Sequence, residues 1–527
     1  MKNKKLISLL LVITMIASLM TGCSGKAQNQ GVGEGKETKN LLFQANGNTP
    51  YINLDPSVEN SNGVMVLHNT YETLTYYNYE TGKIEPMLAE SWSTSEDGKS
   101  WAFKIKQGVK FHDGADLNAE AVKKSIDRTI KLGLGASFIW DSVDNIEFIG
   151  NDEVKFNLKY PAPIDLIASA AYAAFIISPN AVEKDSDWFN QGNCAGTGPY
   201  KIKKAVAGEE IVLEKFDDYW KEWKDNQFAN VVIKKVPESS ARRQLLEKGE
   251  AQISVNFSTT DIEAMKKSDK VQIVQRPLYD TVVGCLNTEK YPLDNVDFRR
   301  ALSYAFPYEE TVSKVLEGQG VQSYGLIPSG LWGHSEDLMQ YKCDLDKAKE
   351  YLDKSGVKTD GLTLEMTISS GYDEYRNFAQ LYQINLKKLG INLEIREMAW
   401  DTQWEKGKNL NPKDRQDIFL FIWWPDYPSP ISWFEGLVRS EDKIFFNLSY
   451  IKNPNLDAKI QEASMLTVTD RDKAEKIMVE MQKEVVDQAY FIHMYDKSAS
   501  YAISKDLKGF STNPAYPTVV RYFDLYK

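Results

Sequence analysis

A cluster of tryptophans around one aspartate is the part of this sequence whose residue types best suit ligand binding. Five of the twelve tryptophans lie in a short stretch, and Asp426 and Tyr427 follow two of them directly. The five are Trp400, Trp404, Trp423, Trp424 and Trp433. Exposed aromatic faces stack on sugars or on peptide side chains. We expect at least half of these tryptophans to fill a hydrophobic core instead.

The signatures of catalysis are missing from the sequence. Asp97 to Ser100 resembles the end of a phosphate-binding loop, but Ser93 stands where that motif needs glycine. Neither G-x-S-x-G nor H-E-x-x-H occurs. The four histidines (His68, His112, His334 and His493) have no metal-ligand spacing, and pairs among 74 acidic residues are too common to indicate glycoside hydrolysis. We therefore expect a binding protein without enzymatic activity, metal or cofactor.

A parallel sheet is predicted to position the aspartate. Residues 362–368 and 391–398 read as strands around a helix at 374–389 that ends at Gly390, which forms a βαβ unit. Residues 418–422 are apolar throughout, as expected for a strand covered on both faces. Ligands of such sheets bind beyond the carboxyl ends of the strands, so the loop from Trp423 to Pro428 is the first candidate site. The alternative is that Asp426 only caps a turn beside Pro428.

Strands and amphipathic helices alternate elsewhere, which indicates a mixed α/β protein. The other predicted strands cover residues 101–105, 211–216 and 231–236, and the other predicted helices cover 119–131, 456–464 and 472–488. Asn118 is the candidate N-cap of the first of these helices, whose buried face should carry Val122, Ile126 and Ile130.

The amino-terminal residues read as an export signal. Three lysines precede the apolar stretch from Leu6 to Met20, which is too short for a confident membrane span. Leu19 to Cys23 (LMTGC) resembles the bacterial lipobox, in which the cysteine is lipidated and becomes the mature terminus, although Met20 replaces the usual leucine. The alternative is a secretory signal with a chance cysteine. We predict a signal peptide at 1–22 and a flexible tether at 23–39, anchored through two acyl chains on Cys23.

Chain length, net charge and cysteine spacing indicate the number of lobes, the partners and the state of the thiols. The remaining body is longer than one hydrophobic core usually supports, so two or three lobes are expected. A formal net charge of −11 argues against nucleic acid as a partner. Cys194, Cys285 and Cys343 show no paired spacing. We favour buried free thiols, with one disulfide among the three as the alternative.

Several motifs are similar to those of the extracellular solute-binding proteins of family 5, which serve peptide, nickel and some oligosaccharide importers. The matching segments, in chain order, are residues 85–92 (EPMLAESW), 97–101, 108–114 (GVKFHDG), 196–200 (GTGPY), 295–302 (NVDFRRAL), 346–349, 386–391 and 453–457 (NPNLD). His112, within one of these motifs, is expected to be structural.

The resemblance implies a periplasmic-binding-protein-like α/β fold of the large type II class, with two hinged lobes and an extra lobe. Lobe I would comprise residues 40–74, 194–277 and 489–527, the extra lobe 75–193, and lobe II 278–488. Hinges are expected near 278–287 and 488–495, where closure around a ligand would occur.

The resemblance also implies a ligand site. Asp426 matches the family's aspartate that pairs with a peptide α-ammonium group, while Trp423 and Trp400 match pocket tryptophans. Trp424 and Tyr427 are added as neighbours. Leu420 stands where some oligopeptide binders carry an arginine for the ligand carboxylate, so ligand length stays open.

The function implied is capture of a di- or oligopeptide outside the cytoplasm and its delivery to the permease and ATPase subunits of an ABC importer. The protein is expected to be a monomer, lipid-anchored to the cell membrane on its periplasmic or outer side. An oligosaccharide ligand is the alternative, and a nickel ligand is a more distant one.

Overall fold

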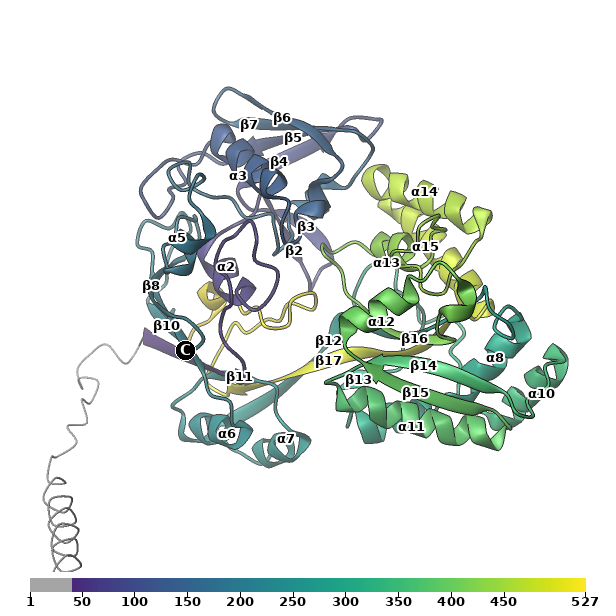
Figure 1. The fold of residues 1–527 in the computed structure, drawn as a ribbon. Coiled ribbons are helices and arrows are strands. Elements are labelled where there is room, and N and C mark those ends of the chain that lie inside the picture. The colour runs from purple at the N-terminus through teal and green to yellow at the C-terminus, as the bar shows by residue number, and fades with distance from the viewer. Residues whose placement is uncertain (1–39) are drawn as a thin grey trace, which may run out of the picture. The chain divides into compact units, whose positions relative to one another are not determined.

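The computed structural model describes residues 40–527, in which one mixed sheet of eleven strands dominates (Figure 1). Its strands are ordered β15-β14-β16-β12-β17-β11-β1-β10-β9-β8, with β13 paired to β17. Their bounds are β1 Leu41–Asn46, β8 Tyr200–Val206, β9 Glu210–Lys215, β10 Asn230–Lys235, β11 Ile253–Val255, β12 Val271–Leu286, β13 Gly320–Val321, β14 Thr363–Ser369, β15 Asn392–Met398, β16 Ile418–Trp423 and β17 Phe491–Ser504. The predicted strands at 211–216, 231–236, 362–368, 391–398 and 418–422 are confirmed to within two residues.

Two long strands, β12 and β17, carry the chain between the two halves of this sheet (Figure 1). They pair antiparallel from Val271↔Ser504 to Cys285↔Phe491. The register shifts between Pro277 and Thr281 and again between Val282 and Val283, as at β-bulges. The segments predicted as hinges therefore lie on two neighbouring strands, although the lobe boundaries stay a prediction.

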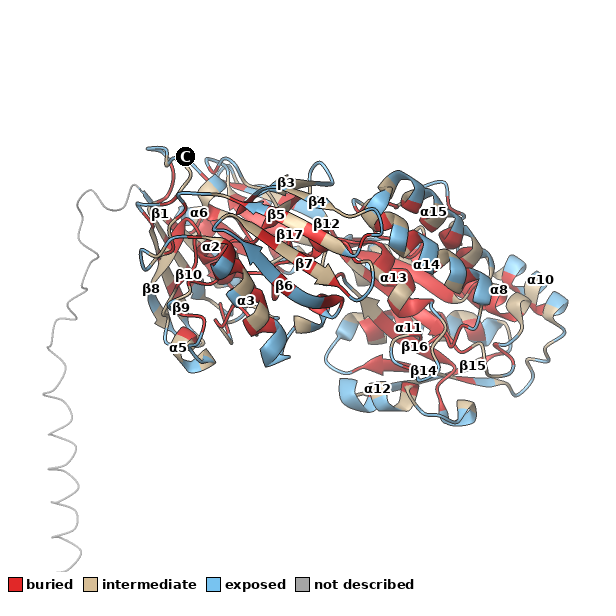
Figure 2. Cartoon of the chain, turned by 90° about the horizontal axis from the view of Figure 1, so that it is seen from above, coloured by how far each residue is buried: buried red, intermediate tan, exposed pale blue. Residues whose placement is uncertain are grey.

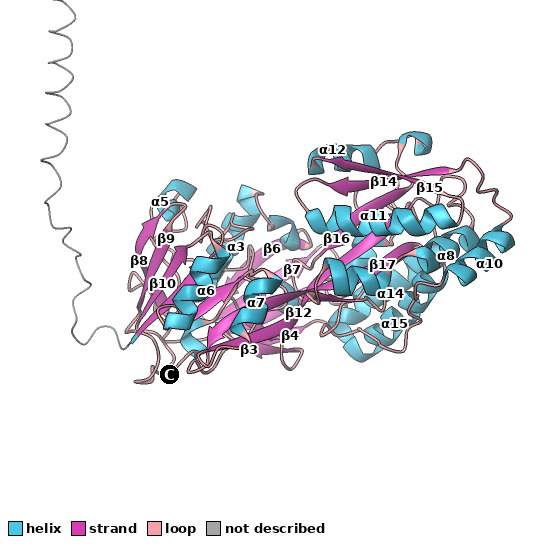
Figure 3. Cartoon of the chain, turned by 90° about the horizontal axis from the view of Figure 1, so that it is seen from below, coloured by secondary structure: helices cyan, strands magenta, loops and turns pink. Residues whose placement is uncertain are grey.

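The predicted βαβ unit is confirmed. β14 runs parallel to β15 and to β16, and α11 (Asp373–Lys388) connects the first two and packs along them (Figure 3). The connection turns at Gly390, whose φ of +80° suits glycine because it carries no Cβ. In β16 the residues from Ile418 to Phe421 are all buried, as expected of a strand covered on both faces (Figure 2).

Residues 75–158 form two smaller sheets. β2 (Thr75–Asn78) pairs with β3 (Lys83–Pro86), and a four-stranded sheet has the order β4-β5-β7-β6. The bounds of the latter are β4 Ala89–Thr94, β5 Ser100–Ile105, β6 Val143–Ile149 and β7 Glu153–Leu158. The strand predicted at 101–105 is β5. α3 (Ala119–Leu132) packs on β6 and β7, and Figure 2 shows residues of β6 exposed on the outer side.

α3 is capped as predicted but does not bury all of the predicted face. The Asn118 side chain accepts a hydrogen bond from the Ala121 backbone N–H, and Val122 and Ile126 are fully buried. Ile130 is 39% exposed, which contradicts the prediction. Each step of four residues turns about 40° beyond a full helical turn, so a stripe of such steps rotates away from the core. Thr129 takes the buried position instead.

The remaining helices lie between the strands along the chain. They are α2 Val64–Thr70, α4 Ile164–Ile167, α5 Ser186–Asn190, α6 Ser239–Lys248, α7 Thr259–Met265, α8 Val296–Ala305, α9 Tyr308–Glu310, α10 Leu345–Ser355, α12 Trp400–Gly407, α13 Ile431–Leu437, α14 Pro454–Thr469 and α15 Arg471–Asp487. The late helix predicted at 456–464 is longer in the structure. Asn453 caps α14 and Pro454 occupies its first turn, where proline is favourable. α15 buries Ala474, Met478, Met481 and Val485, whereas Ile477 on the same face is only partly buried.

Hydrophobic clusters follow these elements. One gathers residues from Leu74 to Ile176 around the four-stranded sheet, a second lies under α8 and α11, and the largest continues from the β1 side of the large sheet to α13–α15. The three cysteines beyond residue 39 are unpaired, as favoured, but only Cys285 is fully buried and Cys343 is exposed. In the part of the chain that the structure describes, no helix is long and apolar enough to span a membrane.

Candidate ligand-binding site

The carboxyl ends of three parallel strands meet at one edge of the large sheet. β14 ends at Ser369, β15 at Met398 and β16 at Trp423, and their parallel register brings these ends together. Trp400, Trp424 and Asp426 follow two of these ends within three residues. The predicted site residues therefore lie at one edge of the sheet, on the start of α12 and on the end of β16 with the loop that follows it.

Asp426 has an unpaired carboxylate in a partly buried position. Neither a hydrogen bond to another side chain nor an ion pair is found for it among residues 40–527. Burial raises the pKa of its carboxyl group to about 6, because the charged form loses hydration without gaining a cation. Asp426 thus offers a desolvated acceptor that a cation would stabilise, while its contact with a ligand stays a prediction.

Tyr516 holds the Asp426 loop, and Tyr172 packs against Tyr516. The Tyr516 hydroxyl donates to the Asp426 backbone carbonyl at 2.8 Å and accepts from the Ala171 backbone N–H at 3.3 Å. The ring of Tyr172 meets that of Tyr516 edge-on at 4.8 Å. The loop after β16 is thus bonded to a residue 90 positions after it, which in turn is bonded to a segment about 250 residues before the loop.

Tyr172 is close to acidic groups from three separate elements. Burial raises the pKa of its hydroxyl, and the charges of Glu59, Asp280 and Asp426 add to this rise. Asp280 lies on β12, and burial raises the pKa of its carboxyl group to about 6, against the effect of Lys497 on β17. The region around Tyr172 is therefore anionic, which favours a cationic group of a ligand over an anionic one.

The five tryptophans divide between the surface and the core. Trp400 is 41% exposed and Trp424 is 49% exposed, whereas Trp433 is fully buried. Trp404 and Trp423 are partly buried against the largest core cluster. Three of the five thus help to form the core, as predicted, and the other two present free aromatic surface.

Two predicted site residues face protein rather than open space. The Trp423 indole packs against α13 so closely that a Cβ on Gly436 would lie 2.3 Å from its ring. Tyr427 packs against the core cluster of the four-stranded sheet. We interpret both as supports of the Asp426 loop, while their predicted contact with a ligand stays a prediction.

Trp400 belongs to an aromatic group on α12 and β16. It stacks on Trp404 at 5.2 Å and on Phe421 at 5.9 Å between ring centroids. Phe445 lies near Trp404 and is 56% exposed. Such a wall can cover apolar or planar parts of a ligand. Phe421 and Phe445 were not among the predicted site residues.

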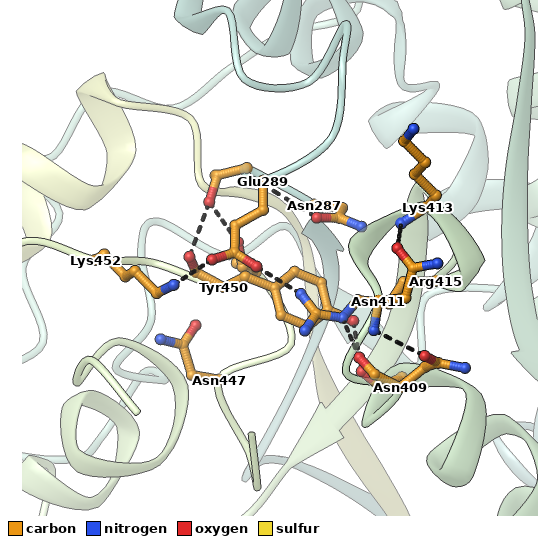
Figure 4. Close-up of polar contacts among 12 residues, drawn as sticks. Asn287, Glu289, Asn409, Asn411, Lys413, Arg415, Asn447, Tyr450 and Lys452 are labelled. Atoms are coloured by element: carbon orange, nitrogen blue, oxygen red, sulfur yellow. Dashed lines mark hydrogen bonds and ion pairs between the residues drawn. The ribbon is translucent and has the colours of Figure 1, made fainter. Parts of the chain in front are cut away.

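A polar cluster at the far end of β12 supports α12 (Figure 4). The Arg415 guanidinium, 4% exposed, pairs with Glu289 at 2.6 Å and lies 4.1 Å above the Tyr450 ring. Lys452 pairs with the same glutamate. The Tyr450 hydroxyl donates to the Gly407 carbonyl at 2.8 Å, at the end of α12. Because these charges are paired with one another, we assign this cluster to positioning α12 and its Trp400.

His112 is structural, as expected. Its Nε2 lies 2.9 Å from the Gly198 carbonyl and its Nδ1 lies 3.2 Å from the Cys194 sulfur. Burial lowers the pKa of the imidazole to about 4, so the ring is neutral at pH 7. No group of side chains suited to a metal ion is found among residues 40–527.

Asp280, Tyr172 and Tyr516 were missed by the sequence-based prediction. Asp280 left a signal, since it is the one charged residue in the apolar run from Leu278 to Leu286, inside a predicted hinge. The two tyrosines left none. Their position depends on contacts between segments far apart in the chain.

Comparison with known proteins identifies the family. The model of the bacterial extracellular solute-binding proteins, family 5 Middle, matches residues 83–444. The probable D,D-dipeptide-binding periplasmic protein DdpA of Escherichia coli K12 is 31% identical over 88% of this chain and 89% of its own length. The dipeptide-binding protein of the same strain is 26% identical over 84% and 86%.

A solved structure shows the same fold. HbpA2 from Haemophilus parasuis superposes with a TM-score of 0.83 at 21% identity, covering 93% of this chain and all of that one. The periplasmic-binding-protein-like α/β architecture implied by the sequence motifs is thereby confirmed. The chain belongs to the bacterial extracellular solute-binding proteins of family 5.

Proposed function

We propose that this protein captures a short peptide outside the cytoplasm, through the peptide's free amino terminus, and delivers it to the permease of an ABC importer. The observation that carries the proposal is the unpaired, desolvated carboxylate of Asp426 beyond the carboxyl end of β16. An α-ammonium group supplies only donors and a positive charge, which is what this carboxylate lacks. The names of the two dipeptide-binding relatives support a peptide ligand.

Binding by closure of two lobes accords with the arrangement of the hinge strands. β12 pairs with β17 on both sides of Asp280. The backbone of the Asp426 loop accepts a hydrogen bond from Tyr516, in the carboxyl-terminal segment. Arg471 at the start of α15 also forms two bonds, of 2.8 and 2.7 Å, with Asp165 in α4. A ligand that bridges these elements would favour the closed state over the open one.

The test is a double cycle between Asp426 and the ligand's amino group. Asp426→Ala should cost a dipeptide with a free amino terminus roughly 2–5 kcal/mol of binding free energy, because one partner of a buried charge pair is removed. The N-acetylated form of the same dipeptide should bind the wild type poorly and lose little more on mutation. Isothermal titration calorimetry measures both.

Asp373→Ala is the matched control, because Asp373 begins the helix after β14 at the same sheet edge and its side chain is 86% exposed. It should leave both affinities unchanged. Equal losses for the free and acetylated dipeptides in Asp426→Ala would remove the assignment of the ammonium group. Unchanged peptide should be recovered after binding, and hydrolysis would contradict a role as a binder.

Anchoring by a lipid on Cys23 forms part of the proposal. Cys23 and the signal peptide lie outside the described residues, so the support is the lipobox-like sequence and the extracellular family. Cys23→Ala should yield a folded protein that no longer fractionates with membranes. Retention in the membrane fraction would refute the lipid anchor without affecting peptide binding.

An oligosaccharide is the second candidate ligand. The exposed faces of Trp400 and Trp424 favour it, since indoles stack on sugar rings. If the wild type binds an oligosaccharide but no peptide, whether its amino terminus is free or acetylated, the ligand is an oligosaccharide and not a peptide.

A further inference from the structure

A second unpaired carboxylate lies on the hinge strand β12. Asp280 falls within the irregular stretch between the register pairs Pro277↔Ser498 and Thr281↔Asp496, where the backbone bulges. Its side chain is partly buried, and no hydrogen bond or ion pair within 4.0 Å is found for it among residues 40–527. Like Asp426, it is a desolvated acceptor that lacks a cation.

Each charged or titratable group around Asp280 can be named. The positive charge of Lys497 on β17 acts to lower the pKa of the Asp280 carboxyl group, but Lys497 forms its ion pair with Glu374, at 4.0 Å. The Asp496 carboxyl group on β17 accepts a hydrogen bond from the Ser323 hydroxyl at 2.7 Å. Tyr172, Tyr375 and Tyr501 complete the surroundings, and the charge of Asp280 contributes to raising the pKa of all three. The negative charge of Asp280 is thus only partly compensated.

Aromatic surface lies beside this carboxylate. The pairing of β12 with β16 ends at Thr281↔Trp423, so Asp280 and Trp424 are each the next residue beyond the last pair on these two neighbouring strands. The Trp424 indole is 49% exposed. A carboxylate flanked by aromatic rings suits an ammonium or guanidinium group, which gains a charge-assisted hydrogen bond and a cation–π contact together.

We propose that Asp280 binds a basic side chain of the ligand, so that the preferred ligand is a peptide with a lysine or arginine in addition to its free amino terminus. This inference rests on the proposed peptide-binding function and assigns a second contact within the same site. Asp426, after β16, would then bind the amino terminus of the ligand, and Asp280, on β12, would bind its basic side chain. A neutral peptide would leave Asp280 desolvated and unpaired on closure, which disfavours it.

The experiment compares tripeptides that differ in one side chain. Calorimetry is run with peptides carrying lysine, norleucine or ε-acetyl-lysine at the first, second or third position. The wild type should bind the lysine peptide about tenfold more tightly than its norleucine counterpart at one of these positions, and acetylation should remove the advantage. Asp280→Asn should lower the lysine preference to within about threefold of unity, because the carboxylate that pairs with the side-chain cation is gone.

Asp496→Asn serves as the control, because Asp496 is the neighbouring hinge carboxyl group but is 2% exposed and already hydrogen-bonded. It should keep the lysine preference. Thermal unfolding of each variant shows that the fold is retained, and Asp280→Glu provides a second variant that should retain part of the preference.

Two results would overturn the inference: equal affinity of the wild type for lysine and norleucine peptides, or a lysine preference that survives in Asp280→Asn. Both leave the proposed function standing, because neutral peptides would still bind. Failure of every free-amine peptide to bind would instead refute the proposed function itself.

Discussion

Asp496 should make the stability of this protein fall as the pH rises. Its side chain is 2% exposed, and burial raises the pKa of its carboxyl group from 3.8 to about 7, even though the Ser323 hydroxyl donates to it. Between these two pKa values the folded state holds a proton that the unfolded state has lost. The contribution is therefore fully present below about pH 4 and is lost as the pH rises through 7.

The magnitude follows from the shift of about three pKa units. At 1.36 kcal/mol per unit, the ionised Asp496 costs the folded state up to about 4 kcal/mol above pH 7. Asp496→Asn removes the charge and keeps an oxygen that accepts from Ser323. We expect this variant to match the wild type near pH 4 and to gain about 1.4 kcal/mol of relative stability per pH unit until about pH 7.

The assay is urea unfolding followed by tryptophan fluorescence at intervals from pH 4.5 to 8.5. The difference between the variant and the wild type is the informative quantity, because buried histidines act in the opposite direction. Burial lowers the pKa of His112 and His493 to about 4, so each lends stability that is lost as the pH falls below 6.5. Asp217→Asn, at a side chain 87% exposed, is the control and should show a flat difference. A pH-independent difference for Asp496→Asn would refute the reasoning.

Three further predictions concern packing, a buried ion pair and ligand affinity. Gly436→Ala places a Cβ 2.3 Å from the Trp423 ring, so overpacking should lower the free energy of unfolding by roughly 1–3 kcal/mol and weaken peptide affinity. Gly208→Ala is the control, because Gly208 has open space around it and a φ of +78°. It should show only the cost of backbone strain, without loss of peptide affinity. The Arg128 guanidinium donates two hydrogen bonds, of 2.7 and 2.8 Å, to Asp55, whose side chain is fully buried. Arg128→Met removes both bonds and should lower the free energy of unfolding, measured in urea, by roughly 3–5 kcal/mol. A loss under about 1 kcal/mol would contradict this prediction. The affinity for a peptide without a basic side chain should rise as the pH increases from 5 to 7, because its amino-terminal cation requires the ionised form of Asp426, and calorimetry should find the rise absent in Asp426→Asn.

Local elements could be predicted from the sequence because their signals are local. The apolar run at 418–421 is buried in β16, Gly390 ends the α11 connection with a positive φ, and Asn118 caps α3. The position of Asp426 beyond a parallel strand followed from the order of one βαβ unit and the next strand. In each case a few neighbouring residues restrict the backbone enough to decide the outcome.

Contacts between distant segments were decided by tertiary structure alone. Tyr516 reaches the Asp426 carbonyl from 90 residues away, and Trp423 is packed against Gly436 rather than turned outward. Asp280 stands beside β17 because β12 and β17 pair through a bulge, and the sequence pattern specifies neither the pairing nor the bulge. Residue types and local periodicity determined which strands and helices form and where a ligand site should lie. Which carboxylates lie near that site depends on packing between segments far apart in the chain, because only the folded sheet brings β12, β16 and β17 together.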